Sequence, residues 1–100
     1  MATENQNSNH LLLDTLPSAK GLRFALVVSH WNSEITESLY EGAKNILSQK
    51  NATQIDRIDV PGSFELVYAS RSAIDRDYDA VIAIGSVIRG ETSHFDYVCQ

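Results

Sequence analysis

The sequence predicts a three-layer α/β fold in which helices cover both faces of a parallel sheet. Two unbroken apolar runs, Phe24 to Val28 and Ala80 to Ile84, are typical of strands that are buried on both faces of such a sheet. Between them lie a segment of helical periodicity, a shorter strand and a second helical segment. This β-α-β-α-β order with short links predicts parallel strands joined by right-handed crossovers.

Apolar residues at helical spacing indicate two helices. The first is expected to begin at Asn32 or Ser33, which are favourable N-cap residues, and to end near Asn51. Its apolar face consists of Ile35, Leu39, Ala43, Ile46 and Leu47. The second is expected from about Ser63 to Asp75, with Leu66, Ala69, Ala73 and Ile74 facing inward.

The segment from Gln54 to Val60 is predicted to be an edge strand. It alternates imperfectly and carries three charges, which discourage pairing between sheet edges. Pro61 and Gly62 end it. After the last strand, the residues from Thr92 onward resemble the start of a third helix.

Composition narrows the class of protein. One hundred residues suffice for a single domain, and 43% apolar content is ordinary for a soluble protein. The net charge of −5 argues against a nucleic-acid partner, which requires a basic face. The longest apolar runs are far too short to cross a membrane, and Cys99 has no intramolecular partner, so we expect a cytoplasmic protein.

Residues 1–20 are predicted to form a flexible N-terminal arm and residues 21–100 the α/β domain. The first nine residues are polar and rich in Asn and Ser, and no secretory signal is evident. The leucines at 11–13 either cap the domain's own core or dock on a neighbouring subunit.

Three segments leave the carboxyl ends of the predicted strands: 29–32, 61–65 and 85–94. Ligands of such sheets bind beyond these ends, where the winding direction reverses, so we expect the segments to converge on one site. Trp31 is either a packing residue or a ring that stacks on a planar ligand. Glu65 either complements a helix dipole or accepts hydrogen bonds from a polyol.

The segment from Gly85 to Thr92 has the spacing of a phosphate-binding loop, but Glu91 stands where that motif requires lysine. The reversed charge excludes nucleoside triphosphate hydrolysis. What remains is either an ordinary strand-to-helix turn or a helix start that attracts one anion near Arg89. His94, in the first turn of that helix, is either a surface residue or a near-neutral imidazole able to exchange a proton.

No group of residues has the spacing of a metal site. His10, His30 and His94 lie far apart in the sequence, and Cys99 has no neighbouring ligand.

Together, these segments resemble a known enzyme family. Trp31-Asn32 after a buried strand, the segment from Val60 to Leu66 and the segment from Ala83 to Tyr97 are similar to 6,7-dimethyl-8-ribityllumazine synthases of riboflavin biosynthesis. The similarity runs from about Leu22 to the last residue. It implies a flavodoxin-like fold that these 100 residues contain only as far as the third strand and the start of the third helix.

The resemblance implies a cofactor-free transferase that condenses 5-amino-6-(D-ribitylamino)uracil with 3,4-dihydroxy-2-butanone 4-phosphate. By position, Trp31 would stack on the pyrimidine and His94 would transfer protons. Ser63, Phe64 and Glu65 would line the ribityl side, Ser86, Val87 and Ile88 would meet the pyrimidine edge, and Glu91 and Thr92 would bind the phosphate.

The family resemblance also implies a homo-oligomer, either a ring of five subunits or a sixty-subunit shell. Family members continue well beyond the position of Gln100, and the neighbouring subunit completes each site from that later part. Two other functions therefore stay open: a non-catalytic assembly scaffold, and a flavodoxin-like module that binds a flavin phosphate. The bulky segment from Ser29 to Asn32 lacks the hydroxyl-rich loop expected of the latter.

Overall fold

A computed structural model of the chain describes residues 13–88. Five elements follow one another: β1 (Arg23–Ser29), α2 (Ser33–Gln49), β2 (Gln54–Val60), α3 (Ser63–Ile74) and β3 (Ala80–Ile84). Their order and bounds agree with the predicted elements to within about two residues, which is the usual uncertainty of element ends. Within the described part of the chain, no helix is both long and apolar enough to cross a membrane.

The three strands form one parallel sheet in the order β2-β1-β3. Phe24 of the central strand pairs with Ile55 on one side and Ala80 on the other. The chain therefore winds outward from β1 to β2 and then returns past β1 to β3, so the winding direction reverses between β1 and β3. The charged strand β2 lies at a sheet edge, as its sequence predicts.

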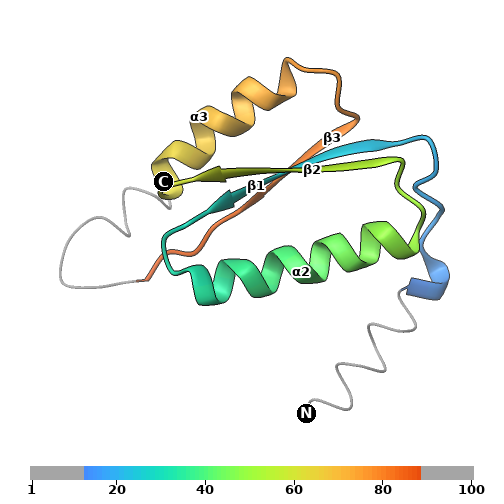
Figure 1. The fold of residues 1–100 in the computed structure, drawn as a ribbon, viewed down its shortest axis with the longest axis horizontal. Coiled ribbons are helices and arrows are strands. Elements are labelled where there is room, and N and C mark those ends of the chain that lie inside the picture. Colours follow the sequence, from blue (N-terminus) through green and yellow to red (C-terminus); the bar gives the residue numbers. More distant parts are fainter. Residues whose placement is uncertain (1–12, 89–100) are drawn as a thin grey trace, which may run out of the picture.

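Helices α2 and α3 cover opposite faces of the sheet (Figure 1). A hydrophobic core lies on each face of the sheet, and alternate residues of β1 contribute to the two cores. Leu26 and Val28 pack toward α2, and Val27 packs toward α3. Residues 25–29 are buried throughout, which explains why β1 has an unbroken apolar pattern instead of an alternating one. This arrangement confirms the predicted three-layer flavodoxin-like fold.

The buried side of α2 differs from its predicted apolar face. Thr36 and Tyr40, which were not part of the predicted face, are buried. Ala43 and Leu47, two of the five predicted residues, pack on the core as expected. The other three, Ile35, Leu39 and Ile46, are 47%, 51% and 40% exposed. Two apolar stripes run along this helix one residue apart, and the sheet contacts the one that contains Tyr40.

The inward face of α3 is largely as predicted. Leu66 and Ala73 are buried and Ala69 packs on the core. Ile74 is the exception, because its side chain is 58% exposed. It is the last residue of α3 and lines an open pocket beside β3, so it has neighbours on one side only.

The chain is attached to the domain just before β1. Ala19 is buried, and its N–H donates to the Lys50 carbonyl at 2.6 Å. Gly21 has a φ of 87°, a left-handed conformation that favours glycine, and its N–H donates to Thr53 Oγ1 at 2.7 Å. The first twelve residues of the predicted arm lie outside the described part.

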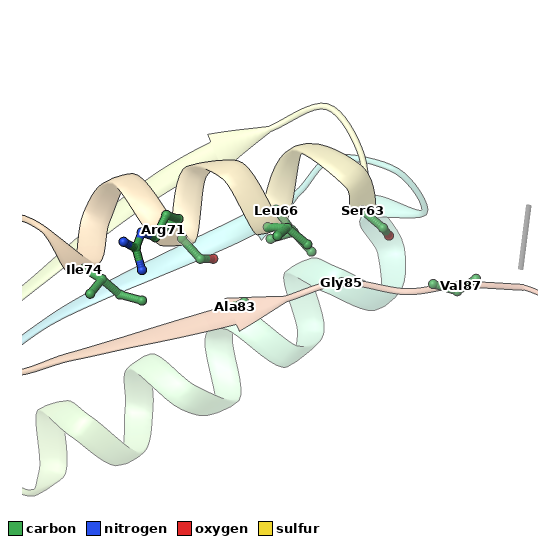
Figure 2. A pocket seen from close by; sticks show the side chains of 9 residues that line it. Ser63, Leu66, Arg71, Ile74, Ala83, Gly85 and Val87 are labelled. Atoms are coloured by element: carbon green, nitrogen blue, oxygen red, sulfur yellow. The ribbon is translucent and has the colours of Figure 1, made fainter. Parts of the chain in front are cut away.

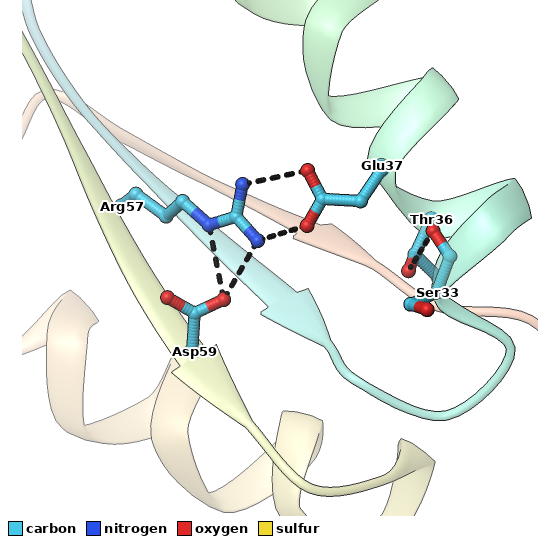
Figure 3. Close-up of polar contacts among 5 residues, drawn as sticks. All are labelled: Ser33, Thr36, Glu37, Arg57 and Asp59. Atoms are coloured by element: carbon cyan, nitrogen blue, oxygen red, sulfur yellow. Dashed lines mark hydrogen bonds and ion pairs between the residues drawn. The ribbon is translucent and has the colours of Figure 1, made fainter.

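Arg57 of β2 pairs with two carboxylates, Glu37 of α2 and Asp59 of its own strand, and the first of these joins α2 to the sheet edge (Figure 3). Its guanidinium makes two hydrogen bonds to the Glu37 carboxylate and two more to Asp59, at 3.0 and 2.8 Å. The guanidinium carbon also lies 4.4 Å from the centre of the Tyr40 ring. The hydrogen bonds from Arg57 lower the pKa of Glu37, and the carboxylates raise the pKa of Arg57.

We expect Arg57→Met to destabilise the fold more at neutral pH than in acid. The folded-state pKa of Glu37 lies below its unfolded value, so its contribution is present above the unfolded pKa and is lost as pH falls through the folded pKa. The lost contact with Tyr40 has no such pH dependence. Urea unfolding between about pH 3 and about pH 7 measures the difference in unfolding free energy from wild type.

The matched control is Arg71→Met, on the exposed side of α3. Its difference from wild type should stay constant with pH. A difference for Arg57→Met that is equally constant would contradict the role of the Glu37 ion pair.

Candidate active site

The chain segments that follow the three strands meet at one edge of the sheet. The His30 N–H donates to the Val60 carbonyl at 2.7 Å, and the Trp31 N–H donates to the Pro61 carbonyl at 3.0 Å. These bonds continue the β1–β2 ladder beyond the strands, so the backbone of Trp31 is held independently of its ring. The first two segments are therefore joined as the topology predicts.

The segment after β3 is held by the other two. The Ser86 hydroxyl accepts a hydrogen bond from Asn32 Nδ2 at 3.2 Å, and the Ser86 carbonyl accepts one from Ser63 Oγ at 3.5 Å. Asn32 follows β1 and Ser63 begins α3. Ser86 is thus the residue at which all three segments are tied together.

Of the seven predicted binding residues that the structure describes, four are exposed. Trp31 is 57% exposed, Phe64 56% and Ile88 59%, and Glu65 is also exposed. Ser63, Ser86 and Val87 are half-buried. The structure therefore presents two aromatic rings and one carboxylate near a hydrogen-bonded framework of serines, which is a suitable arrangement for a planar polar ligand with a polyol chain.

Gly85 allows α3 to approach the end of β3 closely. A Cβ atom added there would lie 2.5 Å from Leu66 Cδ1 and 3.6 Å from Ser63 Oγ. Any larger residue would have to displace Leu66, which is buried in the core. The absence of a side chain at Gly85 therefore keeps Ser63 within reach of Ser86.

An open pocket of about 520 Å³ extends from this edge along α3 and β3 (Figure 2). It is lined by Ser63, Leu66, Val67, Ser70, Arg71, Ile74, Ala83, Gly85 and Val87. The surface that its wall exposes is almost entirely apolar, and its lining includes neither Trp31 nor Glu65. A pyrimidine has many polar atoms and would find few partners there, so we place the candidate site at the strand ends, which this pocket meets only at Ser63, Gly85 and Val87.

A second pocket, of about 510 Å³, lies beside the end of β2 and is lined by His30, Arg57, Asp59, Val60 and Pro61. Arg57 is already engaged there by two carboxylates. Within residues 13–88, no group of three or more His, Cys, Asp or Glu side chains could hold a metal ion.

The model of one protein family, 6,7-dimethyl-8-ribityllumazine synthase, matches residues 21–100. This match covers all five described elements and the three segments that meet at the sheet edge. The chain belongs to the lumazine synthase family.

Relatives named 6,7-dimethyl-8-ribityllumazine synthase are similar along the whole chain. The protein from Flavobacterium johnsoniae is 52% identical over all of this chain and 54% of its own length. Those from Christiangramia forsetii and Porphyromonas gingivalis are 46% and 44% identical, again over all of this chain and over 62% and 64% of their own lengths. The chain thus spans between about half and two thirds of the length of these lumazine synthases.

Three of the site residues predicted from the family resemblance lie outside the described residues: Glu91, Thr92 and His94. The described ones, Trp31, Ser63 to Glu65 and Ser86 to Ile88, come together at the sheet edge, and their individual roles stay predictions. Asn32 has a further contact at this edge that neither its prediction as a helix cap nor its place in the strand-end motif indicates.

Asn32 makes no side-chain capping bond in the structure. Its backbone is left-handed, with φ 59° and ψ 50°, so its amide is directed elsewhere and reaches Ser86. One signal in the sequence is compatible with this: asparagine enters the left-handed region more readily than most residues, and here it directly follows a strand-end aromatic.

Proposed function

We propose that the protein, as a lumazine synthase, condenses 5-amino-6-(D-ribitylamino)uracil with 3,4-dihydroxy-2-butanone 4-phosphate in riboflavin biosynthesis. The observation that carries the proposal is the meeting of the 30–32, 63–65 and 86–88 segments at one sheet edge, in a chain that matches the family model over the same segments. No metal or cofactor is required by this reaction.

In the proposed reaction, the 5-amino group of the pyrimidine attacks the ketone and loses water to form an imine. Inorganic phosphate is then eliminated, and the second nitrogen closes the ring with loss of another water. No electrons are gained from or lost to an outside partner. Proton transfers are the main chemical demand, and much of the acceleration comes from holding the two reactants together.

In this proposal Trp31 stacks on the pyrimidine ring, and the backbone of Ser86 to Ile88 pairs with the pyrimidine edge. The exposed ring and carboxylate of Phe64 and Glu65 line the ribityl chain, where Glu65 accepts hydrogen bonds from hydroxyls. Glu91 and Thr92, which lie outside the described residues, bind the phosphate in this proposal, and His94 transfers protons.

We also propose that the protein acts as a homo-oligomer, a ring of five or a larger shell, in the cytoplasm. Exposed apolar side chains on both helices support association, since surfaces of this kind are commonly covered by a partner. They are Ile35, Leu39 and Ile46 on α2 and Val67 and Tyr68 on α3. The proposed small-molecule substrates need neither a nucleic acid nor a membrane.

The proposal is tested by mixing the two substrates with the full-length protein and following the fluorescence of the product and the release of phosphate. We expect turnover, and we expect His94→Ala to lower kcat about 10- to 100-fold, the low end for the loss of a general acid–base group. The KM of the phosphorylated ketone should change little, because the phosphate is held by other groups.

Oligomers without turnover would contradict the proposal and favour the scaffold. Tight binding of a flavin phosphate without turnover would favour the flavin module. Wild-type kcat in His94→Ala between about pH 6 and about pH 8 would assign the proton transfers to another group.

A further inference from the structure

Asn32 has an unusual backbone for the residue that precedes a helix. Among the described non-glycine residues, only Asn32 and Asn51 have positive φ, and helix N-caps ordinarily have extended backbone. The Asn32 carbonyl still accepts the first helical bonds, from the Ile35 and Thr36 N–H groups at 3.0 and 3.2 Å. The backbone of Asn32 therefore starts α2, while its side chain is left available for another contact.

That other contact spans the winding reversal of the sheet. Asn32 Nδ2 donates to Ser86 Oγ at 3.2 Å, joining residues that are 54 positions apart in the sequence. The two residues follow β1 and β3, the neighbouring strands between which the winding reverses. The contact joins the side chain of Asn32, the residue after Trp31, to the side chain of Ser86, the first residue of the 86–88 segment.

We propose that Asn32 is a positioning residue for the pyrimidine. Its amide holds the Trp31 ring in place relative to the backbone of residues 86–88. The inference rests on the proposed function for the identity of the ligand. Trp31 needs such support because the residue is 57% exposed, so core packing restrains its ring little. Ser86 is restrained from its other side by Ser63, at the carbonyl. Without the Asn32 amide, Ser86 is still bound to Ser63 at the start of α3 but is no longer bound to the segment that follows β1.

Three variants separate the amide contact from the backbone conformation. Asn32→Gly adopts the left-handed backbone freely but removes the amide. Asn32→Asp also tolerates that backbone and keeps an oxygen that accepts a hydrogen bond from the Ser86 hydroxyl. Ser86→Ala removes the same contact from the opposite end and leaves Asn32 unchanged.

In steady-state kinetics of the full-length protein, loss of the Asn32–Ser86 contact should change only the KM of the pyrimidine substrate. We expect Asn32→Gly and Ser86→Ala each to raise the KM of the pyrimidine substrate about 3- to 10-fold, the usual effect of one lost hydrogen bond. The KM of the phosphorylated ketone should stay within about twofold in both, and Asn32→Asp should stay close to wild type. The double variant should raise the KM of the pyrimidine no further than the more impaired single variant does, because both changes remove the same contact.

A purely structural role predicts a different result. It would lower the fraction of active enzyme, and hence the apparent kcat, without changing the KM of the pyrimidine. That result would overturn the proposal, as would additive effects of Asn32→Gly and Ser86→Ala.

A measurement without substrate keeps the inference separate from the proposed function. The protein is labelled with 5-fluorotryptophan, and the ¹⁹F resonance of Trp31 is assigned by its disappearance in Trp31→Phe. We expect the resonance to shift or broaden in Asn32→Gly and Ser86→Ala and to be retained in Asn32→Asp.

An unchanged resonance in Asn32→Gly overturns the positioning role even if the enzyme turns over. A wild type that fails to turn over refutes the proposed function, and the ¹⁹F spectra still decide whether Asn32 positions Trp31.

Discussion

Replacing Leu26 with alanine is expected to lower the free energy of unfolding by about 2–5 kcal/mol, the range found for leucines deleted from well-packed cores. Leu26 is 0% exposed in the central strand and packs with Val28, Tyr40 and Ile84. Both neighbouring strands and α2 enclose it, so the surroundings can relax only a little into the space. Chemical unfolding of the variant and the wild type measures the loss.

Leu39→Ala is the matched control, because it makes the same chemical change on the side of α2 away from the sheet. Leu39 is 51% exposed, and alanine and leucine have similar helix propensities. In the dissociated subunit, where no partner covers this side chain, we expect the free energy of unfolding to change by no more than about 0.5 kcal/mol. Equal losses at both positions would contradict the assignment of the buried side of α2.

Trp31→Ala is expected to weaken binding of the pyrimidine substrate about 5- to 150-fold, which corresponds to the 1–3 kcal/mol typical of a base stacked on an aromatic ring. Trp31 is 57% exposed, and its backbone is held by its own N–H bond to the Pro61 carbonyl. The fold should therefore keep most of its stability. Calorimetric titration with the pyrimidine alone measures the Kd, since no reaction occurs without the ketone.

Trp31→Phe serves as the control for this prediction. A smaller ring keeps the stacking geometry and should retain most of the affinity. If Trp31→Ala bound the pyrimidine as tightly as wild type, or lost its cooperative unfolding, Trp31 would be a packing residue and not a stacking one.

The order of elements and the sheet were predictable because their signals are local. The unbroken apolar run from Phe24 to Val28 is explained by burial on both faces, and the charges of β2 are explained by its place at a sheet edge. Topology then follows from the short crossovers. The meeting of the strand-end segments follows in turn, because parallel strands bring their carboxyl ends to the same edge.

The features that were predicted wrongly or missed are the buried side of α2 and the partner of the Asn32 amide. Both are determined by tertiary contacts and not by local sequence. The stripe of Ile35 and Leu39 is as apolar as the stripe that contains Tyr40, yet Tyr40 is buried because Arg57 lies against its ring and the sheet lies beneath it. The Asn32 amide was expected at the helix start, but its partner is Ser86, which no local pattern of residues identifies.

The placement of β1 between two later strands has a consequence for how the chain folds during synthesis. Arg23 at the start of β1 contacts Asp79, which is 56 residues later and directly precedes β3. Contacts so distant in sequence slow folding, because a long loop must close before they form. While the ribosome completes β3, the apolar residues of β1 have at most one neighbouring strand, and exposed strand edges of this kind promote aggregation of nascent chains. The most deeply buried strand of the described sheet is thus synthesised before either of its partners.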